Sequence, residues 1–175
     1  MNCCRKKKDE TREVVITIHR KDVMYEIRNL GYVEGDVMDG ENGHRKHQMQ
    51  DIGEDGNVDR VTRIMDLAFA ECCNACGRYA YEEIEDGMTD DDAYREETGY
   101  VLRLKMPRAY SQTGIRLLTK YIHEYMVDCV MAEWTELVNP ESTARWREKC
   151  AVLAEQISVT LAARYGVMTR PTRPF

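Results

Sequence analysis

The chain has 175 residues, of which 43% are hydrophobic and 32% are charged, and its formal net charge is -6 at pH 7. This length and composition predict one folded domain with a strongly solvated surface and a core that does not require disulfides. The negative net charge argues against a protein that binds DNA mainly through its overall electrostatics, although local basic arms remain possible.

The lack of a membrane-spanning stretch or a secretory signal, together with the cysteine content, predicts a protein kept in a reducing cytoplasm. No stretch reaches the roughly 20 apolar residues that span a bilayer, and the opening MNCCRKKK lacks the apolar centre of a secretory signal. We therefore expect no membrane partner. The cysteines are Cys3, Cys4, Cys72, Cys73, Cys76, Cys129 and Cys150. Their odd number favours thiols that pack as small apolar side chains over a disulfide framework.

The first part of the chain predicts an arm, a strand and a short helix. Residues 1–12 are charged and are expected to form a flexible basic arm. The β-branched run EVVITIHR predicts a short strand. The next segment, KDVMYEIRNLG, predicts a short helix with Val23 and Ile27 on one side and Gly31 as its stop.

Two segments predict exposed loops. Residues 35–57 combine several glycines with many polar residues and have no sustained period. Residues 84–98 are strongly acidic, which is typical of a solvated connection.

Between these loops, VDRVTRIMDLAFAECCNACGRYAYEEIE predicts a long helix that runs to about Glu83, because its apolar residues recur at helical spacing. Cys73 and Cys76 form a CxxC pair inside it. This spacing is shared by zinc ribbons and redox helices, but a zinc site would need a second pair of ligands. Packing is therefore the favoured interpretation of Cys72, Cys73 and Cys76, and a small zinc- or thiol-dependent protein remains an alternative.

The segment TGYVLRLKMP alternates apolar and polar residues and predicts a half-buried strand that ends at Pro107. Together with the N-terminal strand it gives two candidate strands. A lone two-stranded ribbon is marginally stable, so these strands are expected either to pair within the chain or to join strands of a neighbouring subunit.

Two further helices are predicted after Pro107. The first spans about Thr113 to Leu137, and Asn139 is expected to cap the second, with Pro140 at its first position and Gly166 at its end. Residues 167–175 are rich in Arg and Pro and predict an extended tail.

The segment YIHEYMVDCVMAEW is one side chain short of a helical zinc-peptidase motif. That motif needs a second histidine four residues after His123, and this position is Val127. A single histidine leaves most of a tetrahedral site unfilled. We therefore interpret His123 as part of a packing helix, whose apolar stripe is Ile115, Leu118, Ile122, Tyr125, Met126, Cys129, Val130 and Trp134.

The predicted fold class is mainly α, with three long helices in a bundle, a short N-terminal strand–helix unit and a small β element; residues 13–166 form its single domain. The apolar stripes exceed what one small bundle hides, so some side chains are expected to be available for subunit contacts. The predicted interface residues are Tyr121, Tyr125, Met131, Trp134, Arg170 and Arg173. The chain carries no phosphate loop, nucleophile elbow or Ser/His/Asp signature. We therefore predict no enzyme, no catalytic or metal-binding residue and no cofactor.

Several segments together resemble a set of small proteins encoded in the structural gene blocks of Bacteroidales phages and prophages. These segments are ITIHRKDVMYEIRNLGYVEGD, DRVTRIMDLAF, YVLRLKMPRAY, LLTKYIHEYMVDCVMAEWTELVNPESTARWREK and the tail TRPTRPF. The resemblance covers most of residues 14 to 175 and consists of hydrophobic patterns. The opening of the chain and CCNAC do not belong to it.

The resemblance implies a virion component that is assembled in the bacterial host cytoplasm, similar to a head–tail connector, neck or tail-completion protein. Such a subunit is expected to form a homo-oligomeric ring and to contact neighbouring virion proteins such as portal, connector or tail proteins. The resemblance implies no catalytic residue and no sequence-specific nucleic acid. A nucleic-acid-binding regulator that uses the basic termini remains an alternative.

Overall fold

The computed structural model describes residues 11–38, 43–81 and 98–162, and this part of the chain is mainly helical. In chain order its elements are β1 (Thr11–His19), α1 (Arg20–Val37), α2 (Gly43–Gln50), the short 3-10 helix η2 (Asp51–Gly53), α3 (Asp55–Ala75), β2 (Gly99–Pro107), α4 (Gln112–Val138) and α5 (Pro140–Ala162). The predicted fold class is confirmed, since α3, α4 and α5 are long helices beside a strand–helix unit and a small sheet. Within the described ranges, no helix is both long enough and apolar enough to cross a membrane.

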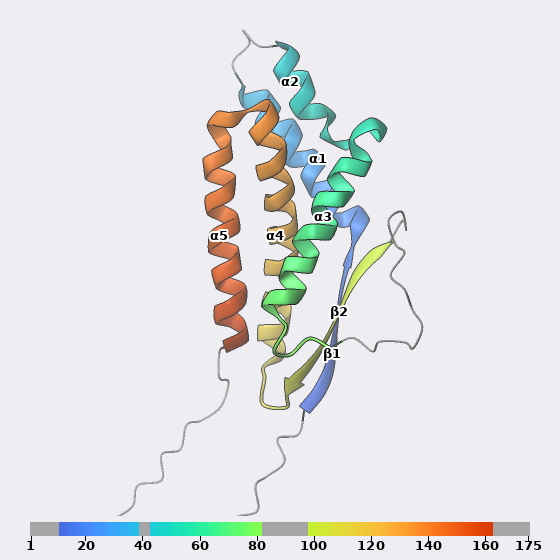
Figure 1. Ribbon diagram of the computed structural model, residues 1–175, viewed down its shortest axis with the longest axis vertical. Helices are drawn as coiled ribbons and strands as arrows, with labels where there is room; N and C mark the ends of the chain where they lie inside the picture. Colours follow the sequence, from blue (N-terminus) through green and yellow to red (C-terminus); the bar gives the residue numbers. More distant parts are fainter. Residues whose placement is uncertain (1–10, 39–42, 82–97, 163–175) are drawn as a thin grey trace, which may run out of the picture.

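Helix α4 is the centre of the fold. It packs against α5, α3 and α1 and also touches α2 and β1, and Figure 1 shows it between α5 on one side and α3 and the sheet on the other. The predicted stripe is confirmed at Leu118, Ile122 and Val130, which are fully buried. Val127 and Met131, which lie outside that stripe, are also fully buried. Because α4 is covered from several directions, its buried surface is a broad belt instead of one stripe.

Helices α4 and α5 form an antiparallel hairpin whose corner is Asn139–Pro140. At the start of α4, the Ser111 side chain accepts a hydrogen bond from the Gly114 backbone N–H at 3.1 Å, which satisfies one of the free amides of the first turn. At the corner, α5 begins at Pro140 as predicted, and the Asn139 carbonyl accepts from the Ser142 amide at 3.1 Å. The side-chain Nδ2 of Asn139 donates to Oε1 of Glu34 at 3.3 Å, while Arg145 pairs with Oε2 of the same carboxylate at 2.5 Å. Glu34 thus ties the end of α1 to the α4–α5 corner.

The two strands pair within the chain, in antiparallel register from Thr11 opposite Pro107 to His19 opposite Gly99. The predicted alternation of β2 is confirmed, because Tyr100, Leu102, Leu104 and Met106 are buried and the residues between them are exposed. Ile16 and Ile18 of β1 complete this apolar face. The sheet therefore covers one side of the helices with its inner face, as half-buried strands do.

The prediction of an exposed loop over residues 35–57 is wrong. α1 continues through Gly31 to Val37, and α2 and η2 follow. Met49 and Ile52 in this segment are fully buried. Gly31 does not stop α1, because it serves a close approach between elements: a Cβ built there would lie 2.7 Å from Cγ2 of Ile52 and 3.0 Å from the Met49 carbonyl oxygen. The glycines of this region are compatible with helix where the packing requires small residues.

Helix α3 also ends earlier than predicted, at Ala75 instead of Glu83. Residues 79–81 pair with the free edge of β2, since the Lys105 amide donates to the Tyr79 carbonyl at 2.7 Å and the Tyr81 amide to the Arg103 carbonyl at 3.1 Å. These sheet hydrogen bonds replace those of a continued helix. The predicted tail 167–175 and the acidic loop, apart from Thr98, lie outside the described residues. So does the predicted arm, except that Thr11 and Arg12 belong to β1.

The contact between Gly31 and Ile52 predicts opposite effects for two glycine substitutions. Gly31→Ala is expected to destabilise the fold, because its Cβ has no room, whereas Gly56→Ala in α3 meets no atom within 4 Å and is expected to be stabilising. Both variants gain helix propensity, so the difference between their unfolding free energies isolates the steric cost of about 1 to 3 kcal/mol. Urea unfolding followed by circular dichroism measures the unfolding free energies of both variants and of the wild type. Equal stabilisation of both variants would contradict the tight packing of α1 on η2.

Candidate functional site

The structure gives a different account of the predicted interface. The predicted residues were Tyr121, Tyr125, Met131, Trp134, Arg170 and Arg173. Met131 is fully buried and Trp134 is 5% exposed, so the prediction that they are available for subunit contacts is wrong. Tyr121 and Tyr125 are half-buried and pack against the core. The two arginines lie outside the described residues. The sequence could not identify these buried positions because it did not reveal how many neighbours α4 has.

Exposed apolar side chains gather instead on α1. We define the outer face of α1 as Tyr25, Tyr32, Val33 and Val37, which are 67%, 62%, 58% and 78% exposed. Tyr25 and Tyr32 lie opposite Val23 and Ile27, which pack on the core, and Val33 and Val37 lie on the flank between these two sides. Helix α1 thus carries apolar side chains on a buried face and on its outer face. The outer face is not covered by any other element of the described residues. Helix α5 adds Val152 and Val159, which are 50% and 54% exposed and lie two turns apart.

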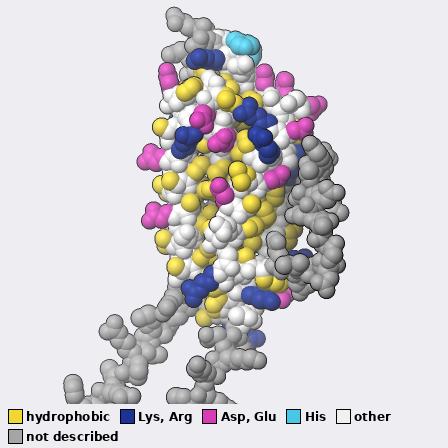
Figure 2. Space-filling model, viewed as in Figure 1, with side chains coloured by type: hydrophobic (Ala, Val, Ile, Leu, Met, Phe, Trp, Pro, Cys, Tyr) yellow, Lys and Arg dark blue, Asp and Glu magenta, His cyan; other side chains and the backbone are white. Residues whose placement is uncertain are grey.

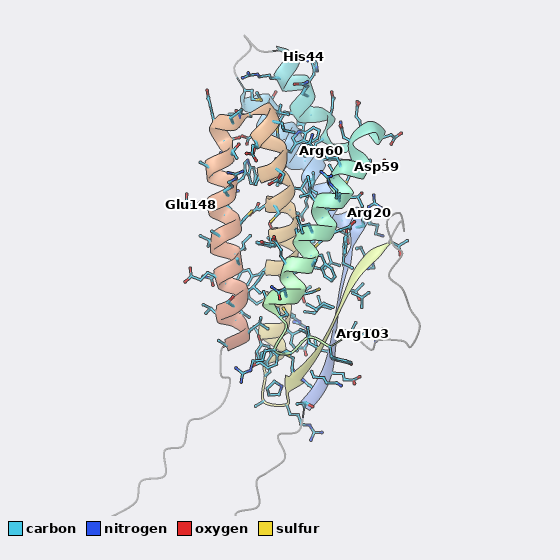
Figure 3. The ribbon with its side chains drawn as sticks, in the orientation of Figure 1. Arg20, His44, Asp59, Arg60, Arg103 and Glu148 are labelled. Carbon is cyan, nitrogen blue, oxygen red and sulfur yellow. The ribbon has the colours of Figure 1, made fainter. Side chains whose placement is uncertain are left out.

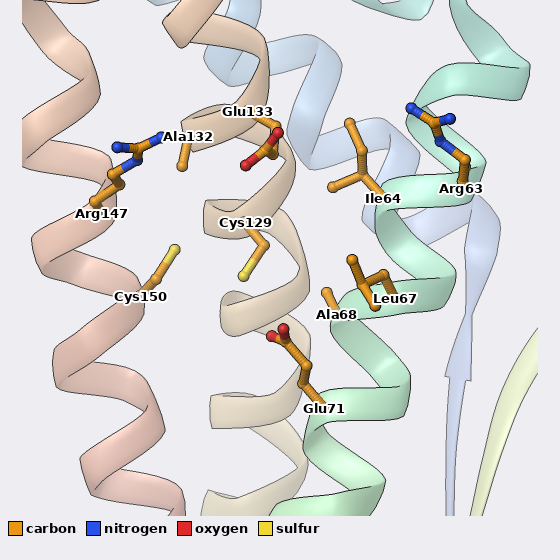
Figure 4. Close-up of a pocket in the computed structure, with 10 residues that line it drawn as sticks. All are labelled: Arg63, Ile64, Leu67, Ala68, Glu71, Cys129, Ala132, Glu133, Arg147 and Cys150. Atoms are coloured by element: carbon orange, nitrogen blue, oxygen red, sulfur yellow. The ribbon is translucent and has the colours of Figure 1, made fainter.

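A groove with a volume of about 510 Å³ lies between α3 and α5, over α4. Figure 2 shows hydrophobic side chains on this face between charged groups of both signs. Its lining comes from three helices (Figure 4): Arg63, Ile64, Leu67, Ala68 and Glu71 from α3, Cys129, Ala132 and Glu133 from α4, and Arg147 and Cys150 from α5. The small side chains of Ala68 and Ala132 leave this space open.

Two thiols meet in the groove. Figure 4 shows the sulfur atoms of Cys129 and Cys150 pointing toward each other from α4 and α5, and both are free thiols. A hydrogen bond from Cys150 lowers the pKa of the Cys129 thiol below its ordinary value. The same hydrogen bond, followed by burial, raises the pKa of Cys150. Deprotonation therefore favours Cys129, with Cys150 as the hydrogen-bond donor.

The pairing of these cysteines follows from the hairpin. Cys129 lies ten residues before Asn139, and Cys150 lies ten residues after Pro140. In an antiparallel helix pair, positions at equal distances from the corner lie at the same height. Both helices and their corner were predicted from the sequence, but both cysteines were interpreted as small apolar packing residues. Their equal distance from Asn139–Pro140 is the signal that could have identified the pair.

Tyr125 connects this site to α3. Its hydroxyl donates a hydrogen bond to Oε2 of Glu71 at 2.6 Å. Burial and this hydrogen bond raise the pKa of Tyr125 above its ordinary value, so the hydroxyl remains a donor near neutral pH. Tyr125 thus holds the groove residue Glu71 on α3 through its hydroxyl.

Among the cysteines of the alternative zinc or thiol site, Cys72 and Cys76 are poor candidates for a reactive thiol, while Cys73 is half-buried. Cys72 is 1% exposed and Cys76 is fully buried, both as members of the core. Burial raises the pKa of Cys72, and it raises that of Cys76 to about 12. Buried thiols of this kind react poorly, because the thiolate is the reactive form. The CxxC pair is therefore replaced by Cys129 and Cys150 as the better thiol candidate.

His123 lies close to two carboxylates. Its Nδ1 is 3.7 Å from Oε2 of Glu26, and these residues and the exposed Glu124 each place one potential ligand atom within 4.8 Å of the others. Such side chains are ligands that divalent cations accept. Val127, where the peptidase motif needs its second histidine, is fully buried. His44 is no substitute, because it lies at the α2 end of the molecule (Figure 3).

The chain was compared with known protein families, proteins and structures. No family model, no curated protein and no solved structure matches the chain.

Asp128, beside Cys129 on the central helix, is 6% exposed and predicts a pH dependence of stability. Burial raises its pKa from 3.8 to about 6, against the opposing charge of Lys149. A raised carboxyl pKa means that the folded state binds the proton more tightly, so stability is lost as the pH rises from about 4 through about 6. Asp128→Asn is expected to exceed the wild type in unfolding free energy by about 1 to 3 kcal/mol at pH 7.5.

The same two proteins should have nearly equal stabilities at about pH 2.5, more than one pH unit below the unfolded-state pKa, where the aspartate is almost fully protonated in both states. Urea unfolding at several pH values measures the difference. Glu133→Gln, an exposed carboxylate on the same helix, is the control and should show no such dependence. A constant difference between the Asp128→Asn variant and the wild type across the pH range would contradict the raised pKa.

Proposed function

We propose that this protein is a structural assembly subunit that forms a homo-oligomeric ring in a phage particle. The observation that carries the proposal is the outer face of α1. Tyr25, Tyr32, Val33 and Val37 are more than half exposed, and they lie along one helix whose opposite side is already packed on the core. Exposed aromatic and apolar side chains of this kind are typical of protein–protein contacts.

Burial of this face against protein is favourable. Removal of apolar surface from water contributes about 25 cal/mol per Å². Two tyrosines supply large, stiff contact area, and each keeps a hydroxyl that can hydrogen-bond at the rim of an interface. Arg28 and Asp36 are exposed on the same helix and provide charged groups around the apolar side chains.

The second half of the contact is α5 of a neighbouring copy. Val152 and Val159 of α5 are seven residues apart, as are Tyr25 and Tyr32 of α1, so two turns on one helix match two turns on the other. Because α1 and α5 are different surfaces, each copy keeps one of them free after pairing. A head-to-tail contact of this type closes into a ring when the rotation between copies permits it.

The phage setting rests on the sequence resemblance. A ring subunit similar to head–tail connector, neck or tail-completion proteins would be assembled in the bacterial host cytoplasm and would become part of the virion. Its further partners would be portal, connector or tail proteins. In this role the protein would need neither a catalytic residue nor a cofactor, and the groove and its thiols would be separate features.

A charge placed on the outer face of α1 is expected to prevent ring formation. The double variant Tyr32→Glu/Val33→Glu introduces two carboxylates that an apolar contact cannot solvate, so the oligomer should dissociate to monomer with its helical content unchanged. Val152→Glu/Val159→Glu should do the same from the other side. Leu137→Glu, at a similarly exposed leucine on α4 (57%), is the matched control and should leave the assembly intact. Sedimentation velocity over a range of concentrations measures all four proteins.

A mixture experiment tests the head-to-tail arrangement. The α1 variant keeps an intact α5 surface and the α5 variant keeps an intact α1 surface, so an equimolar mixture should form heterodimers that cannot grow further. A wild type that stays monomeric at high concentration and in the presence of neighbouring virion proteins would contradict the proposal. Salt-dependent binding to duplex DNA through the termini would favour the nucleic-acid alternative.

A further inference from the structure

We propose that Cys129 and Cys150 are a redox-active dithiol, which exchanges with small-molecule disulfides in the groove and closes to an intrachain disulfide between α4 and α5. This inference is independent of the ring proposal, because the site belongs to one chain and does not use the outer face of α1. Three observations carry it: the facing sulfur atoms, the groove that opens onto them, and their position in the hairpin.

The helices hold the two thiols in a favourable arrangement. Both sulfur atoms lie on the facing sides of one antiparallel helix pair. The α4–α5 contact is the most extensive between any two helices of the described part of the chain. The pair is therefore set by packing rather than by a flexible segment. A disulfide requires the sulfur atoms to approach to about 2 Å and the Cα atoms to lie within about 7 Å, so its formation draws α4 and α5 together at this level.

The two thiols are chemically unequal. The thiolate is the nucleophile in disulfide exchange, and the hydrogen bond from Cys150 favours the thiolate form of Cys129. Cys150 keeps its proton because that hydrogen bond and burial raise its pKa. Cys129 is accordingly the attacking thiol, and Cys150 is the resolving thiol.

The reaction needs one oxidant, a low-molecular-weight disulfide RSSR. The Cys129 thiolate attacks one sulfur of RSSR, the S–S bond breaks, and one RS⁻ leaves and takes up a proton. Cys150 then loses its proton and attacks Cys129 in the mixed disulfide, and the second RS⁻ leaves and is protonated. The protein dithiol is oxidised by two electrons, and RSSR is reduced to two RSH.

The groove suits a charged peptide disulfide. Its volume of about 510 Å³ gives a small molecule access to Cys129. The guanidinium groups of Arg63 and Arg147 line opposite walls, and because Arg147 already pairs with Glu136 at 2.6 Å, Arg63 is the group offered to a ligand carboxylate. Glu133 can pair with an ammonium group, and so can the second oxygen of Glu71, whose Oε2 accepts from Tyr125. Glutathione disulfide carries both kinds of group and is the probe for the experiment.

The experiment treats the folded, fully reduced protein with glutathione disulfide and digests it with trypsin without reduction. Cleavage after Lys120, Arg145, Lys149 and Arg164 places Cys129 in residues 121–145 and Cys150 in residues 150–164. Mass spectrometry should detect these two peptides joined by a disulfide. Cys72 and Cys76 should remain unmodified, because they are core residues.

Two variants assign the roles. Cys150→Ser should trap a stable glutathione adduct on Cys129, because the resolving thiol is absent. In the Cys129→Ser variant, glutathione should add to Cys150 at least tenfold more slowly than it adds to Cys129 in the Cys150→Ser variant, because the reactive thiolate is absent. Circular dichroism identifies a variant that fails to fold, and in that case Cys150→Ala and Cys129→Ala replace the serine variants.

Absence of the joined peptide in folded wild-type protein would overturn the proposal. Equal rates of adduct formation at Cys129 and Cys150 in the two variants would also overturn it, since they would mean that neither thiol is activated. The sedimentation behaviour of the wild type is recorded on the same sample before oxidation. A monomer that forms the disulfide would contradict the ring and support the dithiol, so the two proposals fail separately.

Discussion

The burial of α4 on several sides is the constraint on which the rest of the structure depends. Leu118, Ile122, Met126, Val127, Val130 and Met131 are fully buried, and no single neighbouring helix could cover all of them. α5, α3 and α1 and the inner face of the sheet are each held by contact with this helix. Buried apolar side chains contribute about 1.5 to 3 kcal/mol each, so this belt dominates the stabilisation of the fold.

The same constraint explains where function can reside. Because α4 uses nearly all its apolar side chains inside the chain, surfaces for other molecules must come from the elements around it. α1 presents Tyr25 and Tyr32 outward, and α5 presents Val152 and Val159. Where α3 and α5 do not meet over α4, the small residues Ala68 and Ala132 leave the groove that reaches Cys129. An assembly surface and a thiol site are therefore separate consequences of one central helix.

Sequence periodicity predicted the elements better than their neighbours. The alternation of β2 and the limits of α4 follow from local patterns, and the structure confirms both. Residues 35–57 resisted prediction because glycines that usually mark loops lie in helices here: Gly35 is closely packed, with a built Cβ 2.9 Å from Cγ of Gln50, whereas Gly43 and Gly56 have open space around them. Met131 and Trp134 could not be placed, since a stripe on one helix does not reveal how many partners that helix has. Cys129 and Cys150 could have been paired from the sequence, because they lie at equal distances from the predicted corner at Asn139–Pro140.

Native-state hydrogen exchange tests the central role of α4 most directly. If α4 is the helix on which all others pack, its amides from Ile122 to Met131 can exchange only when the whole domain unfolds. Their opening free energies should then equal the global unfolding free energy from urea titration, while those of α2 should be lower. Exchange of these α4 amides through local opening, at free energies below those of α3 and α5, would contradict the account.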